Sequence, residues 1–446
     1  MYADEEIKVL AYADDIAFFC VDKPSITKAI NATLRFCETA GATVNFDKSR
    51  GFWLGMWALT PSVFANIHWN QSPLRYLGVP LDNFRNSGPH WTSTITTIRR
   101  KVTTWQGRDL SIFARAKACN TFLASKLLYV RQVLHCSRVH VQAFHRVFAC
   151  FICHSSWEAM RRDNLFLPLE KGGLGLVHLF VRQLVMRLFY LKNVRHPFFL
   201  AVNRARLASH LPFLFVTTNF AQELPLWGFL KELVDTISFL KARFNLEYLF
   251  TVNRTYLNVA LIDKLFPELL YRKPYLSLFG QDVLCRVRRM CIAPAAKTFF
   301  FKLHTSTLPV KTWLQEKGLY VAWNTNCRLC NQPETIEHCF ILCRDAFLFW
   351  DILQRTIKKT IPLTCYGIRF LPFKKTASNT PYDLFMLLGL YSLWRSRMID
   401  RHAEPPRSTR SIFREETAQV RSVVATYDPV PEWISRLDAC VCLPEF

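Results

Sequence analysis

The sequence has few acidic residues, and this shortage is its first informative feature. Against 57 lysines and arginines stand only 34 aspartates and glutamates, which leaves a formal net charge of +23 over 446 residues. An excess of this size creates a positive field over much of a folded surface and favours a polyanion as partner. A basic protein whose charges are merely solvated is the alternative, and the composition favours nucleic acid over it.

Long hydrophobic runs are also lacking. No stretch of 18 or more uncharged apolar residues occurs, and the most apolar late segment, 384–394, is too short to span a bilayer. The first six residues, Met-Tyr-Ala-Asp-Glu-Glu, have neither the cationic start nor the apolar core of a signal peptide. We therefore expect an intracellular protein, nuclear or cytoplasmic, that is not secreted and has no membrane partner.

The cysteines do not follow the pattern of a disulfide framework. There are 15 of them, an odd number at irregular spacing, and intracellular proteins keep their thiols reduced. Half of the residues are hydrophobic and 14% are aromatic, so the chain is a folded protein, long enough for several domains with cores of their own. The cysteines are interpreted as reduced thiols together with a metal site.

The first fifty residues predict a strand, a helix and a strand. Residues 9–11 and 16–20 are apolar arms on either side of Tyr12-Ala13-Asp14-Asp15, as in a hairpin with a polar tip. Pro24 opens an amphipathic stretch with helical spacing, and Gly41 suits the end of that helix. An extended run is expected again at 43–46.

Short strands then give way to helices. Strands are expected at 51–55 and 75–79, and the stretch rich in Asn, Gly and Pro at 83–89 marks a boundary. Residues 91–152 show a helical and basic pattern, and residues 178–320 are helical with interruptions at prolines. A linker is expected near 401–410, which contains two adjacent prolines and several arginines.

Two adjacent carboxylates, Asp14 and Asp15, stand at the tip of the predicted hairpin. Like charges this close are costly unless a proton or a cation neutralises them. Nucleotidyl transfer uses such a pair, because two Mg²⁺ ions about 3.5–4 Å apart activate the 3′ hydroxyl and stabilise the leaving pyrophosphate, and oxygen ligands suit Mg²⁺. The alternative is an ordinary surface turn, in which Asp is common.

The motifs around this hairpin resemble those of reverse transcriptases of the non-LTR (LINE-type) retrotransposon kind. Tyr12-Ala13-Asp14-Asp15 is similar to the Tyr/Phe-x-Asp-Asp motif of the family's palm. Asn45-Phe46-Asp47-Lys48-Ser49 looks like the next motif, which ends in Asn-x-x-Lys-Ser/Thr. Tyr76-Leu77-Gly78-Val79 resembles the hairpin that grips the primer end.

The resemblance continues in the helical region. Trp105, the segment 110–115 and the segment 125–129 are similar to the family's thumb. Leu167-Pro168 followed by Gly172-Gly173-Leu174-Gly175-Leu176 matches the segment after it. Order and spacing agree over roughly the first 180 residues, which chance explains poorly.

The resemblance implies an α+β fold: a truncated palm with a short antiparallel sheet and a helix, then a mostly α-helical thumb and connection, a small zinc module and a helical tail. The expected domains are a palm remnant with the Asp-Asp hairpin at 1–50, the end of the palm with the primer-grip hairpin at 51–88, the thumb at 89–155, the connection at 156–320, the zinc-binding module at 321–350 and the C-terminal helical region at 351–446.

The same resemblance assigns roles to individual residues. Asp14 and Asp15 would be catalytic magnesium ligands, with Asp14 the direct one, and Lys48 would stabilise or protonate the leaving pyrophosphate. A solvated strand-end lysine is the alternative for Lys48. Tyr76, Leu77 and Gly78 would form the primer grip. The residues expected to bind nucleic acid are Arg99, Arg100, Lys101, Arg115, Lys117 and Lys126.

A second motif predicts a zinc site. Cys327, Cys330, His338 and Cys343 follow the spacing Cys-x2-Cys-x7-His-x4-Cys, which lets a small turn wrap a tetrahedral Zn²⁺. Buried, unligated cysteines are the alternative, and Cys339 is a spare ligand. The string also resembles the zinc-binding region that follows LINE-type reverse transcriptases, and the stretch 393–397 resembles a Trp-x-x-Arg segment beyond it. Zinc would be structural, and would shape a surface for template RNA or target DNA.

Only eleven residues precede Tyr12, whereas the family's first palm carboxylate and its fingers lie further upstream. We therefore expect that this chain does not polymerise alone, and that Mg²⁺-dependent DNA synthesis on an RNA template belongs to the intact enzyme. The expected partners are an RNA template and a DNA primer or target, with no obligate protein partner. The alternative function is a non-catalytic, zinc-containing nucleic-acid-binding protein.

Overall fold

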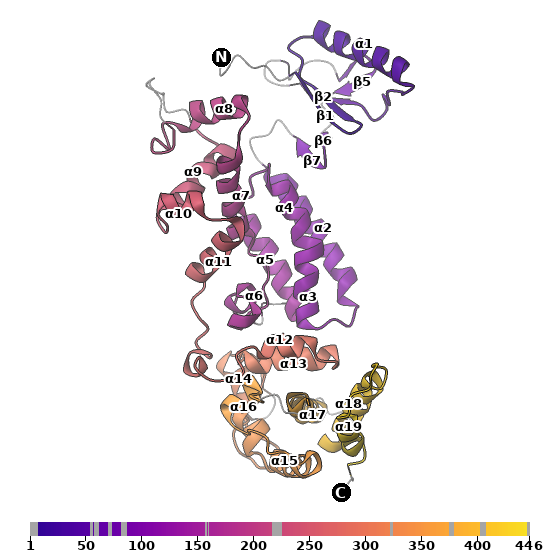
Figure 1. Ribbon diagram of the computed structural model, residues 1–446, viewed down its shortest axis with the longest axis vertical. Coiled ribbons are helices and arrows are strands. Elements are labelled where there is room, and N and C mark those ends of the chain that lie inside the picture. Colours follow the sequence, from indigo (N-terminus) through magenta and orange to yellow (C-terminus); the bar gives the residue numbers. More distant parts are fainter. Residues whose placement is uncertain are drawn as a thin grey trace. The chain divides into compact units, whose positions relative to one another are not determined.

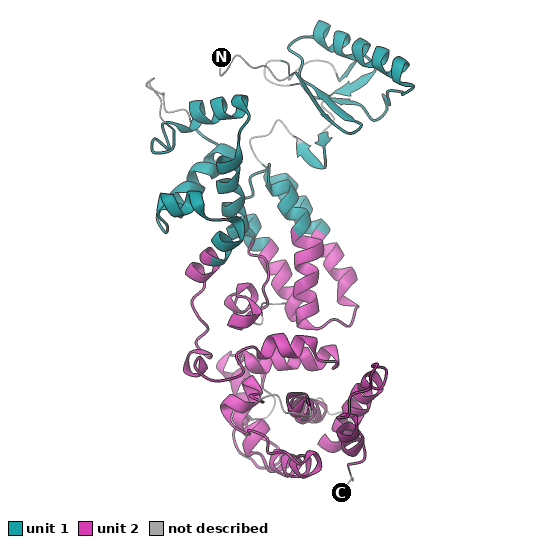
Figure 2. Ribbon diagram, viewed as in Figure 1, with its two compact units in different colours: residues 1–97, 125–143, 179–259 teal, residues 98–124, 144–178, 260–446 magenta. Residues whose placement is uncertain are grey.

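The computed structural model has an α+β fold that is mostly helical with small sheets, in line with the predicted class. It describes residues 8–53, 57, 62–69, 74–81, 87–156, 158, 160–215, 225–321, 324–373, 379–401 and 407–443. Two compact units interleave along the chain (Figure 2): residues 1–97, 125–143 and 179–259 form unit 1, and residues 98–124, 144–178 and 260–446 form unit 2. The expected domains are consecutive instead, and the expected thumb, 89–155, contributes to both units.

Unit 1 contains three small sheets. Their strands are β1 (Val9–Tyr12), β2 (Asp15–Phe18), β3 (Arg50–Gly51), β4 (Val63–Phe64), β5 (Ile67–Trp69), β6 (Leu74–Tyr76) and β7 (Val79–Leu81). The pairs β1–β2 and β6–β7 are antiparallel hairpins, while β5 lies between β4 and a parallel β3. The predicted hairpin around residue 14 is therefore confirmed.

Helix α1 (Lys23–Ala40) begins and ends where the residue pattern predicts. The Asp22 carboxylate accepts a 2.8 Å hydrogen bond from the Ser25 amide and caps the first turn. Gly41 ends the helix with φ at +65°, a conformation that costs glycine little. The helix buries Ile26 against Trp53 and Trp69, whose rings stack 4.0 Å apart.

Two of the predicted strands take another form. Residues 43–46 do not form a strand, because the Asn45 side chain accepts from the Lys48 amide (3.0 Å) and starts a turn. Residues 75–79 are not one strand but the ends of β6 and β7 joined by a turn, in which Leu77 and Gly78 have φ of +47° and +77°. Of the strand expected at 51–55, only Gly51 lies in a strand, β3, and residues 54 and 55 fall outside the described residues.

Besides α1, unit 1 contains further helices, and a buried ion pair links two of them. These helices are α4 (Ser125–Arg131), α7 (Leu179–Asn193), α8 (Pro197–Leu207), α9 (Gly228–Lys241), α10 (Leu246–Thr251) and parts of α2 (Gly88–Gln106), α5 (Arg138–Cys153) and α11 (Arg254–Leu265). The guanidinium of Arg187 lies 2.9 Å from Glu232 and donates to the carbonyl of Arg131. Arg187 therefore joins α7 to α9 and to the end of α4.

Unit 2 is helical in its described part. Its remaining elements are α3 (Ile112–Ala118), η2 (Cys119–Ala124), α6 (Asp163–Phe166), η3 (Leu169–Lys171), η4 (Lys273–Tyr275), α12 (Val283–Arg289), α13 (Pro294–His304), α14 (Lys311–Glu316), η5 (His338–Leu342), α15 (Arg344–Ile357), α16 (Cys365–Phe370), α17 (Tyr382–Arg401), α18 (Thr409–Val424) and α19 (Ile434–Val441). Helix α17, drawn nearly end-on in Figure 1, is buried from Leu384 to Trp394 and packs against α13, α18 and η5. It is the centre of this unit's core.

The expected helical stretches at 91–152 and 178–320 are confirmed. Pro197 and Pro294 lie in the first turn of α8 and α13, where a missing N–H costs nothing, so these prolines begin helices. The linker expected near 401–410 falls between α17 and α18, and its residues 402–406 lie outside the described residues. No helix in the described part of the chain is long and apolar enough to cross a membrane.

Candidate metal centre and nucleic-acid interface

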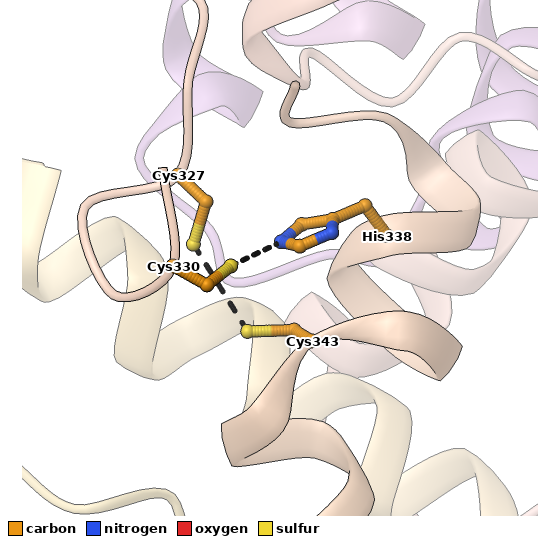
Figure 3. Close-up of side chains that lie close together, drawn as sticks. All are labelled: Cys327, Cys330, His338 and Cys343. Atoms are coloured by element: carbon orange, nitrogen blue, oxygen red, sulfur yellow. Dashed lines mark hydrogen bonds between the residues drawn. The ribbon is translucent and has the colours of Figure 1, made fainter. Parts of the chain in front are cut away.

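The four ligands predicted from spacing lie together in unit 2. The ligand atoms of Cys327, Cys330, His338 and Cys343 are all within 4.8 Å of one another. The Sγ atoms of Cys327 and Cys343 are 4.0 Å apart, and Cys330 Sγ lies 3.1 Å from His338 Nε2. Figure 3 shows the four side chains pointing toward a common centre, two from a loop and two from the helical segment after it.

The loop that carries Cys327 and Cys330 is a short turn closed by backbone hydrogen bonds. The Cys327 amide donates to the Gln332 carbonyl (2.8 Å), and the Asn331 amide donates back to the Cys327 carbonyl (2.9 Å). Asn331 takes a positive φ of 55°, which asparagine tolerates better than most residues. The turn therefore presents both thiols of Cys-x-x-Cys to the same side.

His338 and Cys343 are five residues apart, a spacing that an α-helix places on different faces. Here the segment from His338 to Leu342 is a π-helical turn, η5, and the Cys343 amide donates to the His338 carbonyl (2.9 Å). The wider i to i+5 turn brings the two ligands onto one side. Trp350 anchors the turn by donating its indole N–H to the Phe340 carbonyl (2.7 Å).

The donor set fits a metal ion such as zinc. Three thiols and one imidazole are the ligands that Zn²⁺ prefers, and a tetrahedron with Zn–S bonds of about 2.3 Å has S···S edges of about 3.8 Å. The 4.0 Å between Cys327 and Cys343 is close to that edge. Three of the four ligands are buried and Cys330 is half-buried, so the protein encloses the site.

The state of the thiols also suits metal binding. A hydrogen bond shared with Cys343 lowers the pKa of Cys327, and a hydrogen bond from Arg397 acts in the same direction. The same shared bond raises the pKa of Cys343. Cys339, the spare ligand, lies outside the quartet, and burial raises the pKa of its thiol to about 12.

Residues from α17 complete the surroundings of the site, and residue patterns did not predict their contacts with it. Arg397 donates to Cys327 Sγ at 3.5 Å. Arg401 ion-pairs with Glu334, which is buried beside the loop. Arg328 of the loop pairs with Asp400 at 3.3 Å. The Trp-x-x-Arg pattern that ends in Arg397 was the available signal, but it did not indicate a contact with the cysteines.

The Asp-Asp hairpin lies in unit 1 and is solvent-exposed. Tyr12 pairs with Asp15 across β1 and β2, Ala13 takes a positive φ of 52° in the turn, and both carboxylates are exposed. Within the described residues, no third Asp, Glu, His or Cys joins them within reach of one ion. Lys48 is exposed in the turn after α1. The described residues therefore do not support the expected Mg²⁺ site.

The expected primer grip is held by a residue of the expected thumb. Leu77 and Gly78 form the turn between β6 and β7, after Tyr76. The Tyr129 hydroxyl from α4 donates to the Leu77 carbonyl at 2.6 Å. A Cβ at Gly78 would lie 3.6 Å from the Tyr129 ring, which is an ordinary contact distance. Glycine is favoured at this position because of its positive φ, and not for lack of space.

The expected nucleic-acid-binding residues divide into two groups. Arg99 and Arg100 on α2 and Lys117 on α3 are exposed in unit 2, Lys101 is half-buried, and Lys126 is exposed on α4 in unit 1. Arg115 instead donates to the carbonyls of Leu110 (2.9 Å) and Ile152 (3.0 Å). Its guanidinium therefore holds α3 against α5 and has little capacity left for phosphate.

An aromatic pair accompanies the exposed cations of unit 2. The rings of Trp105 on α2 and Phe122 on η2 lie 5.2 Å apart, and the Arg108 guanidinium lies 4.8 Å from the Trp105 ring centre. Phe122 is 51% exposed. Exposed aromatic faces beside cations are what a single-stranded nucleic acid uses for base stacking and phosphate contacts.

Comparison of the sequence with protein-family models found no match, and a search of curated proteins found none either.

Proposed function

We propose that this chain is the C-terminal part of a non-LTR reverse transcriptase, and that its own contribution is to bind RNA or DNA through a helical unit organised by a structural zinc ion. The observation that carries the proposal is the Cys327, Cys330, His338 and Cys343 quartet. Four protein ligands leave no open position for water or substrate, so such a zinc ion supports shape rather than catalysis.

The charge of the chain supports nucleic acid as the proposed class of ligand. A formal charge of +23 favours a polyanion. In unit 2, Arg99, Arg100 and Lys117 expose cations, and Phe122 offers a ring face for a base. Backbone charge and base stacking together describe a single-stranded nucleic acid, bound without a strong sequence preference.

Metal analysis and binding to a labelled single-stranded RNA test this function together. We expect about one zinc ion per chain and a dissociation constant that rises steeply with salt. Arg99→Gln with Arg100→Gln should weaken binding several-fold, and Phe122→Ala by about tenfold, since one stacked base contributes about 1–3 kcal/mol. The matched controls are Arg195→Gln with Arg204→Gln, which remove the same charge from unit 1, and Phe347→Ala, which removes another exposed ring. Equal losses in the controls, or substoichiometric zinc in a folded sample, would contradict the proposal.

DNA synthesis is the second candidate function, and the Asp14-Asp15 turn favours it. In the intact enzyme these carboxylates would hold Mg²⁺ for nucleotidyl transfer. We propose that they do not act in this chain alone, because no third carboxylate accompanies them among the described residues. Primer extension on an RNA template with Mg²⁺ tests whether this chain alone synthesises DNA. Incorporation that Asp14→Ala abolishes would establish catalysis and overturn the proposed inactivity.

A further inference from the structure

Three side-chain contacts join the end of α17 to the loop that carries Cys327 and Cys330. Arg397 reaches Cys327 Sγ, Arg401 pairs with Glu334, and Asp400 pairs with Arg328. Positions 397 and 401 lie one turn apart on the helix and share a face. Both Arg397 and Arg401 are therefore directed at the loop that holds the first two cysteines.

Arg397 has an unusual environment for an arginine. Its Nε and Nη2 atoms are buried and lack a hydrogen-bond acceptor among the described residues. A buried cation is costly unless an anion is close. The Nη1 atom of the same guanidinium donates to Cys327 Sγ at 3.5 Å, so the acceptor of this hydrogen bond is a sulfur of the metal site.

A bound metal ion with its thiolate ligands would place a net negative charge beside the Arg397 guanidinium. Zn²⁺ with three thiolates and a neutral imidazole has a net charge of −1, because metal ligands must be deprotonated. One guanidinium then brings the centre to neutrality. Arg397 is the only one of the three α17 residues that contacts a ligand atom, since Arg401 and Asp400 contact the loop around it.

We propose that Arg397 is the counter-ion and hydrogen-bond donor of the metal–thiolate centre, so that metal binding and the docking of α17 are one cooperative event. This inference rests on the proposed zinc site and extends it. Because α17 is the buried centre of unit 2, the metal would stabilise the C-terminal helices as well as its own loop. Arg397 would not contact phosphate, because its guanidinium is buried.

Zinc affinity tests the role of Arg397 directly. We expect Arg397→Met to weaken zinc binding by 10–100-fold in competition with a chromophoric chelator, the range usual for partners of metal ligands. Arg397→Lys keeps the charge but loses the planar donor, so its loss should be smaller. The matched control is Arg395→Met on the same helix, whose side chain pairs with Glu416 and should leave zinc affinity unchanged. Wild-type affinity in Arg397→Met would overturn the proposal.

Cobalt substitution provides a readout that survives a partly unstable variant. Hydrogen bonds to a thiolate reduce its donation to the metal, so the sulfur-to-cobalt absorption band of Arg397→Lys should shift relative to wild type. The band should stay in place in Arg395→Met. An unshifted band in Arg397→Lys would exclude a hydrogen bond to the metal-bound sulfur.

Hydrogen exchange tests whether the metal ion stabilises α17. Zinc removal by a chelator should speed amide exchange in α17 by at least tenfold, and leave α7 and α9 of unit 1 unchanged as internal references. Unchanged exchange in α17 would show that the metal stabilises only its loop. If wild type binds no zinc at all, the proposed function fails; if wild type binds zinc and α17 is indifferent to it, only this inference fails.

Discussion

At the scale of single residues, chemistry and burial divide the cysteines of the metal region into two kinds. Cys330 is a ligand candidate at the half-buried edge of the quartet. Cys339 is fully buried behind the site, and desolvation keeps it a neutral thiol. Cys339 and Cys343, four residues apart, therefore differ in role, although spacing alone allowed either as a ligand.

The first prediction follows from this difference. Cys330→Ser should lower the zinc content of the purified chain well below one ion, because a hydroxyl is a poor zinc ligand. Cys339→Ser should keep full zinc content, while destabilising the fold by burying a hydroxyl in an apolar site. Metal analysis of both variants checks this. A zinc loss in Cys339→Ser equal to that in Cys330→Ser would show that the quartet is wrong.

The second prediction concerns His304 and pH. His304 is fully buried at the end of α13, its Nδ1 donates to the Arg369 carbonyl (2.8 Å), and burial lowers its pKa to about 3. Because an unfolded histidine titrates near 6.5, the unfolded chain binds more protons between these values. The stability that His304 contributes is therefore complete above pH 6.5 and is lost as the pH falls toward 3.

The measurement is denaturant unfolding as a function of pH. Below pH 6.5, the free energy of unfolding should fall by up to about 1.4 kcal/mol per pH unit from this group. Glutamine at position 304 keeps a donor for the Arg369 carbonyl but cannot titrate. His304→Gln should therefore flatten the curve, and a slope as steep as wild type would assign the acid sensitivity to other groups.

At the scale of elements, α17 tolerates no added volume at its middle. A Cβ at Gly389 would lie 2.6 Å from the Trp350 ring and 2.9 Å from Phe349 of α15. Glycine therefore lets α17 approach α15 closely, and its small size decides how these two helices pack.

The third prediction tests this contact. Gly389→Ala should destabilise the chain by about 1–3 kcal/mol through overpacking, although alanine favours a helix by about 1 kcal/mol. Gly107→Ala is the control, because nothing lies within 4 Å of the position its Cβ would take. Thermal unfolding measures both. A Gly389→Ala variant as stable as wild type would show that α15 shifts at little cost.

Local signals predicted the elements whose causes are local. Pro24 and Gly41 predict the start and the end of α1, and the Cys-x-x-Cys spacing identifies one half of the metal site. The π-helical turn that brings His338 to Cys343 leaves no periodic pattern in the sequence. The spacing of the two residues indicates only that they lie little more than one helical turn apart. Arg397 lies 70 residues from Cys327 in sequence, and only the packing of α17 brings them together.

At the scale of the whole molecule, the charge excess is the basis for the proposed binding of nucleic acid. Many of the cations already have partners: Arg187, Arg286 and Arg401 are in ion pairs, and Arg115 holds backbone carbonyls. Composition therefore supports the proposed class of partner, but it does not separate the cations available to bind phosphate from those that stabilise helices. The two interleaved units likewise depend on contacts between segments far apart in sequence.

The fourth prediction tests which of these arginines contact phosphate. Each phosphate contact with a single strand contributes about 0.7 to the slope of log affinity against log salt. Arg99→Gln with Arg100→Gln should lower the slope by about 1.4, whereas Arg115→Gln should leave the slope near wild type and reduce stability instead. Titrations between low and moderate salt measure the slopes. A drop in slope for Arg115→Gln would show that Arg115 contacts phosphate after all.

The short distance between Cys327 and Cys343 has a further consequence, for oxidation. With their Sγ atoms 4.0 Å apart, these sulfurs are close enough for an oxidant to join them in a disulfide when no metal holds them. A chain that loses its ion in air would then be locked against reloading until a reductant restores both thiols. Handling conditions, rather than sequence, would decide whether a preparation contains a working centre, and mass spectrometry before and after reduction would reveal the difference.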